Sequence, residues 1–245
     1  MTPGDLVSAV SIAMDVPRET VFQHDRNLVV AGLRTFGGRG RNAPTVTPLD
    51  AARLMIAVLG SARVLDSVET VKAFTEATFH PLAGSPVFDP AIASLPPNHN
   101  FIEALAALIN DASAPFHADH PHQFLRRFAE MMIVCETRPT EGAIRHPRGG
   151  SAEYKTAEQS IAERNKYDPG VFDYEPSYEQ QYGIFQVRST RGAAIVLLGR
   201  AFRENGLAFE TTGQAIGDLM DATTGKPKKR NAKDRAGAKS RAASS

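Results

Sequence analysis

The chain has 245 residues, of which 42% are hydrophobic and 22% are charged, and its net charge at neutral pH is +1. This is an ordinary globular composition, and the length is sufficient for one large domain or two small ones. The single cysteine, Cys135, excludes an internal disulfide framework and a cysteine-rich zinc site, which favours a reducing compartment.

The N-terminal segment does not have the features of a secretory signal. Residues 1–17 lack a basic n-region and are interrupted by Asp15 and Pro17. No apolar run in the chain approaches the roughly 18 residues that a membrane span requires. We therefore expect a cytoplasmic protein without a membrane segment.

Charge is distributed unevenly along the chain. Residues 1–63 hold seven arginines against five acidic residues, and residues 226–245 hold eight basic residues against one aspartate. The residues between them, 64–225, carry a net charge of −8. Both ends suit a polyanion, whereas the acidic middle suits a contact with another protein or with a second copy of the chain.

Two helices joined by a tight turn are predicted near the start of the chain. Apolar residues recur at helical spacing between Leu6 and Met14, and the pattern is interrupted at residues 15–17. The proline there cannot continue a helix but suits the first turn of the next one, which we expect to run from Pro17 to Ala31. Gly32 follows where a left-handed C-terminal cap is needed.

The next stretch of sequence predicts a wing and a third helix. Residues 34–36 and 45–47 are β-prone and flank the glycine- and arginine-rich residues 37–44, a pattern typical of a hairpin tip. Thr47 then offers an N-cap for an apolar helix over residues 49–59.

The remainder of the chain predicts helices and a small antiparallel sheet. Helices are expected over residues 62–79, 101–110 and 192–204, and strands over residues 123–137, 142–146 and 182–189. The polar residues 149–182 are expected to form a loop with a helical turn or two. The last 20 residues lack apolar periodicity and are expected to be disordered.

These patterns together indicate an α+β fold in four parts. The expected parts are a winged helix-turn-helix over residues 1–63, a helical bridge over 64–113, an α+β accessory or oligomerisation unit over 114–225, and a basic tail over 226–245.

The segment from Leu6 to Val46 resembles the winged helix-turn-helix superfamily of bacterial transcription regulators, and its arrangement is similar to that of short prophage-encoded regulators. The resemblance is carried by Leu6, Ala9 and Val10, by the turn at Asp15-Val16, by Thr20, Val21 and Leu28, and by Gly32-Leu33 before the wing. Asp15 stands where such turns usually have glycine.

The resemblance implies that the outward face of the second helix reads DNA. The residues expected on that face are Arg18, Glu19, Phe22, Gln23 and Arg26. Glutamine suits adenine, arginine suits guanine, and phenylalanine can contact a thymine methyl group. The arginines expected to contact phosphates or to enter the minor groove are Arg34, Arg39 and Arg41.

The leading interpretation is therefore a sequence-specific regulator that binds double-stranded DNA and needs no cofactor. A homodimer would place two recognition helices about 34 Å apart on a palindromic target. The alternative is an architectural or packaging-related phage-type protein that binds DNA with little sequence preference through its wing and tail.

A metal-dependent hydrolase is a further alternative. It would use histidines and a tyrosine-rich acidic stretch, namely His80, His117, His120, His122, Asp168, Asp173, Glu175 and Glu179. No cysteine joins the histidines, and their spacing does not place two ligands on one helix face. We therefore expect no metal site and no catalytic residue.

Overall fold

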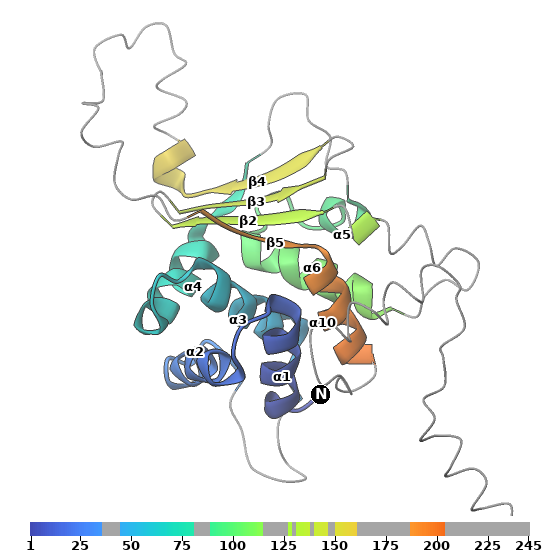
Figure 1. The fold of residues 1–245 in the computed structure, drawn as a ribbon. Helices are drawn as coiled ribbons and strands as arrows, with labels where there is room; N and C mark the ends of the chain where they lie inside the picture. The colour runs from blue at the N-terminus through green and yellow to red at the C-terminus, as the bar shows by residue number, and fades with distance from the viewer. Residues whose placement is uncertain are drawn as a thin grey trace, which may run out of the picture.

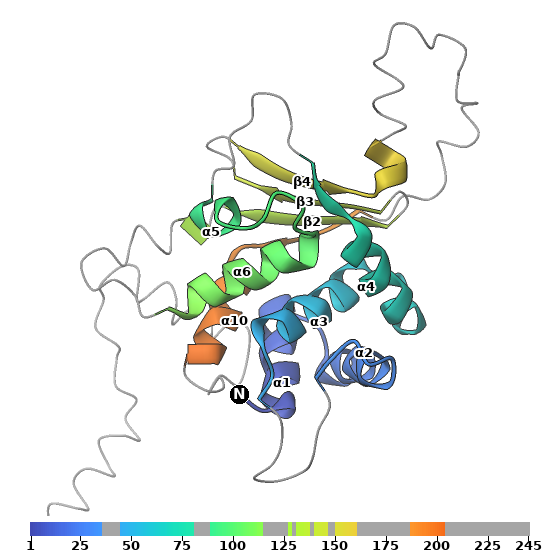
Figure 2. The ribbon, with the colours of Figure 1, turned by 180° about the vertical axis from the view of Figure 1, so that it is seen from behind.

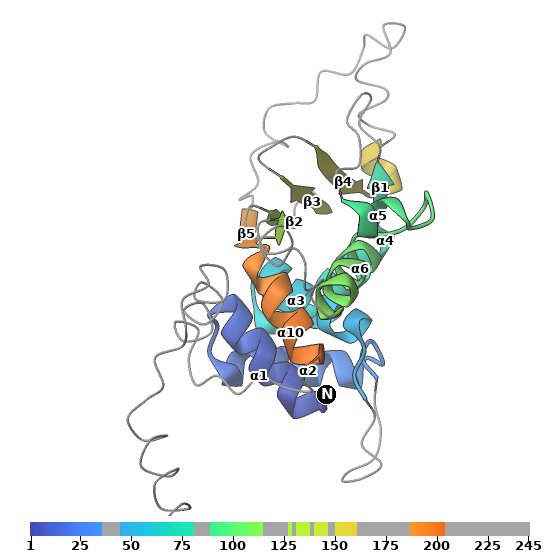
Figure 3. The same ribbon diagram turned by 90° about the vertical axis from the view of Figure 1, so that its right-hand side faces the viewer.

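In the computed structural model, helices cover one face of an antiparallel sheet (Figure 1). The structure describes residues 1–35, 45–80, 89–114, 127–128, 131–137, 140–146, 150–160 and 187–203. Viewed from behind and from the side, α3, α6 and α10 lie beneath the sheet, and α1 and α2 lie farther from it (Figures 2 and 3). The predicted α+β class is confirmed.

The three N-terminal helices form where the sequence predicts them. They are α1 (Pro3–Met14), α2 (Arg18–Val30) and α3 (Pro48–Gly60), and each packs against the other two. Thr2 and Thr47 begin α1 and α3 with capping boxes, in which the threonine hydroxyl accepts from a backbone N–H and an aspartate accepts in return.

The turn between α1 and α2 contains a residue with left-handed backbone conformation. Asp15 lies in the left-handed region at φ 53°, which aspartate tolerates better than most residues, so it replaces the usual glycine. At the other end of α2, Gly32 has φ 69°, and the N–H of Leu33 donates to the carbonyl of Leu28 at 2.9 Å. These features confirm the predicted glycine cap.

The wing lies mainly outside the described residues. Residues 36–44, which include Arg39 and Arg41, are not described, and the described flanks 34–35 and 45–47 contain no strand. The wing therefore stays a prediction.

The chain continues from α3 through a mixture of short helices and strands. These elements are a 3₁₀ turn (Val64–Asp66), α4 (Ser67–Glu76), β1 (Thr78–His80), α5 (Pro90–Ala93), α6 (Phe101–Ser113), β2 (Met132–Thr137), β3 (Thr140–Arg145), β4 (Ser151–Lys155), β5 (Val187–Arg191) and α10 (Ala193–Arg203). The strand order is β1-β4-β3-β2-β5, and every neighbouring pair is antiparallel. The helices α6 and α10 and the hairpin of β2 with β3 agree with the predictions.

Three predictions differ from the structure. The helix expected over 62–79 ends at Glu76, because residues 78–80 instead pair with β4. The loop expected over 149–182 begins with β4, which fills the space between β3 and β1. Of the strand expected over 123–137, residues 132–137 form β2 and residues 127–128 are instead helical, while residues 123–126 and 129–130 lie outside the described residues.

One hydrophobic core joins the helices to the sheet. It includes Leu6 of α1, Ile56 of α3, Leu105 of α6, Ile144 of β3 and Leu198 of α10, each with no exposed surface. In particular, α1 packs against α10, the last described helix. The four-part division stays a prediction, although the core crosses the expected boundaries after residues 63 and 113.

Close packing of α6 on α10 depends on a glycine. A Cβ atom added at Gly199 of α10 would lie only 2.5 Å from the Cβ atom of Ala112 on α6. The two helix backbones can therefore approach this closely only because residue 199 has no side chain.

None of the described helices has both the length and the apolar character that crossing a bilayer requires.

Candidate nucleic-acid interface

The outward face of α2 carries the residues predicted to read DNA. The exposed residues are Arg18, Glu19, Phe22, Gln23 and Arg26. On the opposite side of the helix, Val21 and Leu28 are fully buried. Residues four apart lie on one helix face, so Arg18, Phe22 and Arg26 form a row, and Val30 extends it with 82% of its surface exposed.

Hydrogen bonds from the inner side of α2 fix its rotation. The Nδ1 atom of His24 lies 2.8 Å from the hydroxyl of Ser67, and the amide of Asn27 donates to the carbonyl of Val64 at 2.8 Å. At the outer edge, Nε of Arg18 donates to the Ser8 hydroxyl of α1 at 3.2 Å. The exposed row is therefore presented by a helix that is anchored on three neighbouring segments.

Arg34 is buried, whereas the sequence pattern predicted that it contacts DNA. Its guanidinium donates to the carboxylate of Asp25 at 2.9 Å, and both side chains are 7% exposed. The prediction that Arg34 contacts DNA phosphates is wrong, because its charge is buried in an ion pair within the protein.

The position of Asp25 within α2 is the sequence signal that could have indicated the buried ion pair with Arg34. Asp25 lies four residues after Val21 and three before Leu28, on the buried side of the helix. A carboxylate on an apolar face needs a cation, and Arg34 supplies it.

Asp50 joins the two ends of the segment that would form the wing. Its carboxylate accepts from the N–H of Thr35 at 2.9 Å and from the N–H of Thr47 at 2.8 Å, and it also accepts from both hydroxyls. Burial alone would raise the pKa of Asp50, but these hydrogen bonds outweigh it and lower that pKa. Thr35 and Thr47, on either side of the undescribed residues 36–44, are therefore held together beside the first turn of α3.

The remaining predicted sites lie largely outside the described residues. Arg39, Arg41, the basic tail, His117, His120, His122 and the acidic residues at 168, 173, 175 and 179 are not described. Across the described ranges, no three histidine, cysteine or acidic side chains are grouped as metal ligands. His80 lies in β1, and burial raises the pKa of the Cys135 thiol in β2, which disfavours the reactive thiolate.

Comparison with known proteins identifies no relative, since no family model, no curated protein and no solved structure matches the chain. The geometry of α2 and of the segments that anchor it is therefore the basis for a functional interpretation.

Proposed function

We propose that the chain is a sequence-specific DNA-binding protein that acts as a transcription regulator, with α2 as its recognition helix. The observation that carries the proposal is the exposed face of α2, which presents two arginines, a glutamine and an aromatic ring on a helix anchored from behind. The 13 residues of α2 span roughly 20 Å, and an α-helix fits the major groove of B-DNA.

Four side chains on the exposed face of α2 have a chemical role in this proposal. Gln23 presents a donor and an acceptor that match the major-groove edge of adenine, and Arg26 presents two donors that match guanine. Phe22, with 49% of its surface exposed, can contact a thymine methyl group. Arg18 lies at the N-terminus of α2, where the helix dipole adds to its attraction for a phosphate.

The burial of Arg34 changes the expected contribution of the wing. Arg39 and Arg41 are the basic residues within 36–44, and they remain the candidates for a contact between the wing and DNA. We infer that they contact the DNA backbone from the segment whose flanks Asp50 holds together. They would add affinity for any duplex, whereas α2 would supply sequence preference.

Selection of bound duplexes from a random library, with the full chain, tests the proposal. Fluorescence anisotropy would then compare the selected duplex with a shuffled one. A regulator should prefer the selected duplex by on the order of 10³-fold or more, whereas a much smaller preference would indicate the architectural alternative.

Substitutions in α2 test the assignment of individual residues. Gln23→Ala or Arg26→Ala should weaken binding to the selected duplex by about 1–3 kcal/mol and relax the preference at one base pair. Lys72→Ala, at an exposed position on α4, is the matched control and should bind normally. Equal losses in all three variants, or no binding at low salt, would contradict the assignment.

A further inference from the structure

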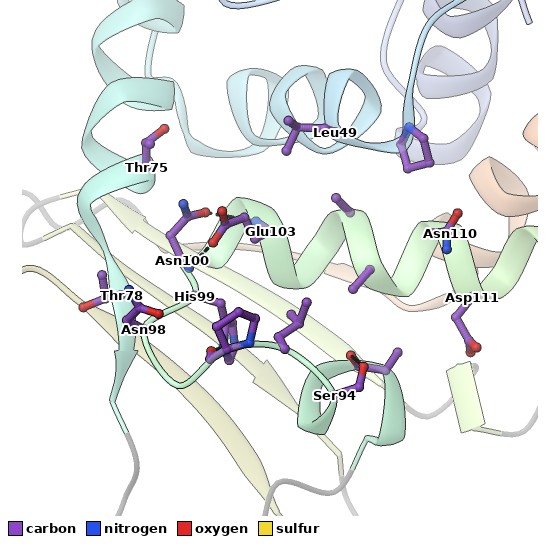
Figure 4. A pocket seen from close by; sticks show the side chains of 16 residues that line it. Leu49, Thr75, Thr78, Ser94, Asn98, His99, Asn100, Glu103, Asn110 and Asp111 are labelled. Atoms are coloured by element: carbon purple, nitrogen blue, oxygen red, sulfur yellow. Dashed lines mark hydrogen bonds between the residues drawn. The ribbon is translucent and has the colours of Figure 1, made fainter.

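A groove of about 800 Å³ opens over α6 and is lined by no residue of α2 (Figure 4). Its floor is the outward side of α6, formed by Glu103, Ala106, Ala107 and Asn110. One wall is the start of α3 and the end of α4, and the other is α5 with the turn that follows it. This volume lies within the range of small-molecule sites. We call this feature the α6 groove.

The cap of α6 places a carboxylate at one end of the α6 groove. Oδ1 of Asn100 accepts from the N–H of Glu103 at 3.0 Å, and Oε2 of Glu103 accepts from the N–H of Asn100 at 2.8 Å. Among the described residues, no donor contacts Oε1 of Glu103, so this oxygen can accept a hydrogen bond from a ligand. Figure 4 shows Glu103 and Asn100 side by side on the groove lining.

A second carboxylate lies at the other end of the α6 groove. Asp111 is eight residues further along α6, roughly 12 Å by the helical rise. Its Oδ2 atom accepts from Arg127 at 2.8 Å, and 39% of its side chain is exposed. Between the two carboxylates, the small side chains of Ala106 and Ala107 leave a shallow apolar floor.

The lining determines which ligands are compatible. The described lining residues include two carboxylates but no lysine or arginine, and Arg127, which pairs with Asp111, is also bound by Asp89. The α6 groove therefore attracts a cation more than an anion. The apolar side chains of Leu49 and Leu95 stand on opposite walls and suit methylene groups. Donors and acceptors come from Thr75, Ser94, Asn98 and Asn110.

His99 supports the wall of the α6 groove from behind. Its Nδ1 atom lies 2.6 Å from the carbonyl oxygen of Pro96, which only accepts, so Nδ1 carries a proton. Its Nε2 atom lies 3.0 Å from the hydroxyl of buried Tyr154. Both ring nitrogens are therefore occupied, and the ring stacks on Phe79 at 5.0 Å between centroids.

We propose that the α6 groove binds a small linear organic amine. One ammonium group contacts Glu103, the aliphatic chain lies over Ala106 and Ala107, and a second amino group reaches toward Asn110 and Asp111. This site is separate from the proposed DNA interface, and its occupancy does not depend on DNA binding.

Calorimetry with spermidine as the probe, at low salt and with the full chain, tests this site. We expect one spermidine per chain and at least tenfold weaker binding by Glu103→Gln. Glutamine at this position retains the capping box, so this variant should fold normally. Ala107→Leu, which fills the floor without changing charge, should also weaken binding at least tenfold.

Glu69→Gln is the matched control, because Glu69 is an exposed carboxylate in the first turn of α4 that does not line the groove. It should bind spermidine like the unaltered chain. Equal binding by all variants, several weak sites per chain, or no binding of spermidine would overturn the proposal. Calorimetry contains no DNA, so this result is independent of whether the α2 assignment holds.

Discussion

Asp50 shows how one carboxylate can organise three segments. It completes the cap of α3 with Thr47 and also binds Thr35, which lies before the undescribed residues 36–44. Its side chain is almost fully buried, so every hydrogen bond it accepts replaces water that it lost on folding.

Asp50→Asn should therefore destabilise the protein by about 1.5–3 kcal/mol at pH 7. Because the folded state lowers the pKa of Asp50, this contribution is complete above the unfolded-state value of about 4 and is lost as the pH falls through the lower folded-state value. Denaturant unfolding from pH 7 to pH 2 would measure the difference between the two proteins.

Asp5 provides the control for this effect. It completes the same kind of capping box on α1 but is less buried, and among the described residues its carboxylate accepts only from Thr2. Asp5→Asn should cost about 0.5–1 kcal/mol. Equal losses at Asp50 and Asp5 would mean that the bonds to Thr35 contribute nothing.

The ion pair of Arg34 with Asp25 gives a second prediction for single residues. Asp25→Leu leaves a buried guanidinium without its carboxylate and should destabilise the protein by about 3–5 kcal/mol. The double variant Asp25→Leu with Arg34→Met removes both charges and should recover much of that loss. A double-mutant cycle by urea unfolding measures the coupling, and additive losses would contradict it.

Between elements, the contact of α6 with α10 should be sensitive to a single methyl group. Gly199→Ala ought to strengthen an isolated helix by about 1 kcal/mol, but here the added Cβ meets Ala112 and overpacks the interface. We expect net destabilisation by about 1–3 kcal/mol, seen as a lower midpoint in thermal unfolding.

Gly4 of α1 is a suitable comparison, because a Cβ there would meet only the Thr2 hydroxyl at 3.9 Å. Gly4→Ala should leave the stability unchanged or raise it slightly. A stabilised Gly199→Ala variant would show that α6 and α10 can move apart at little cost.

Elements defined by local signals were predictable from the sequence. Capping residues, the left-handed Gly32 and the proline break specify α1, α2 and α3 over short distances along the chain. The strand β4 was missed because its five residues gain their structure from pairing with β3 and β1, and β1 lies some 70 residues earlier.

The candidate site was predictable to a similar degree. The exposed row on α2 follows from helical periodicity, because Val21 and Leu28 define the buried side. The burial of Arg34 and the α6 groove depend on tertiary packing. The groove in particular brings together α3, α4, α5 and α6, and no local pattern indicates that their surfaces meet.

Across the whole molecule, the uneven charge predicts how the proposed DNA binding should respond to salt. Residues 226–245 carry eight basic side chains, and each neutralised phosphate releases a counterion. Removing these residues should reduce the slope of log affinity against log salt by up to about 7 in magnitude. The preferred base sequence should not change.

Anisotropy titrations between 50 and 300 mM salt, roughly the range over which such slopes are measured, test this expectation. A shortened chain that lost its preference for the selected duplex would instead place sequence readout in the tail. An unchanged slope would mean that the tail does not contact DNA.

The contact of α1 with α10 affects how the chain folds while it is synthesised on the ribosome. The packing partner of α1 is synthesised about 180 residues after α1 itself. At typical elongation rates the interval is roughly 10–40 s, during which the apolar side of α1 lacks its final cover. The N-terminal helices therefore cannot complete their packing until α10 has been made.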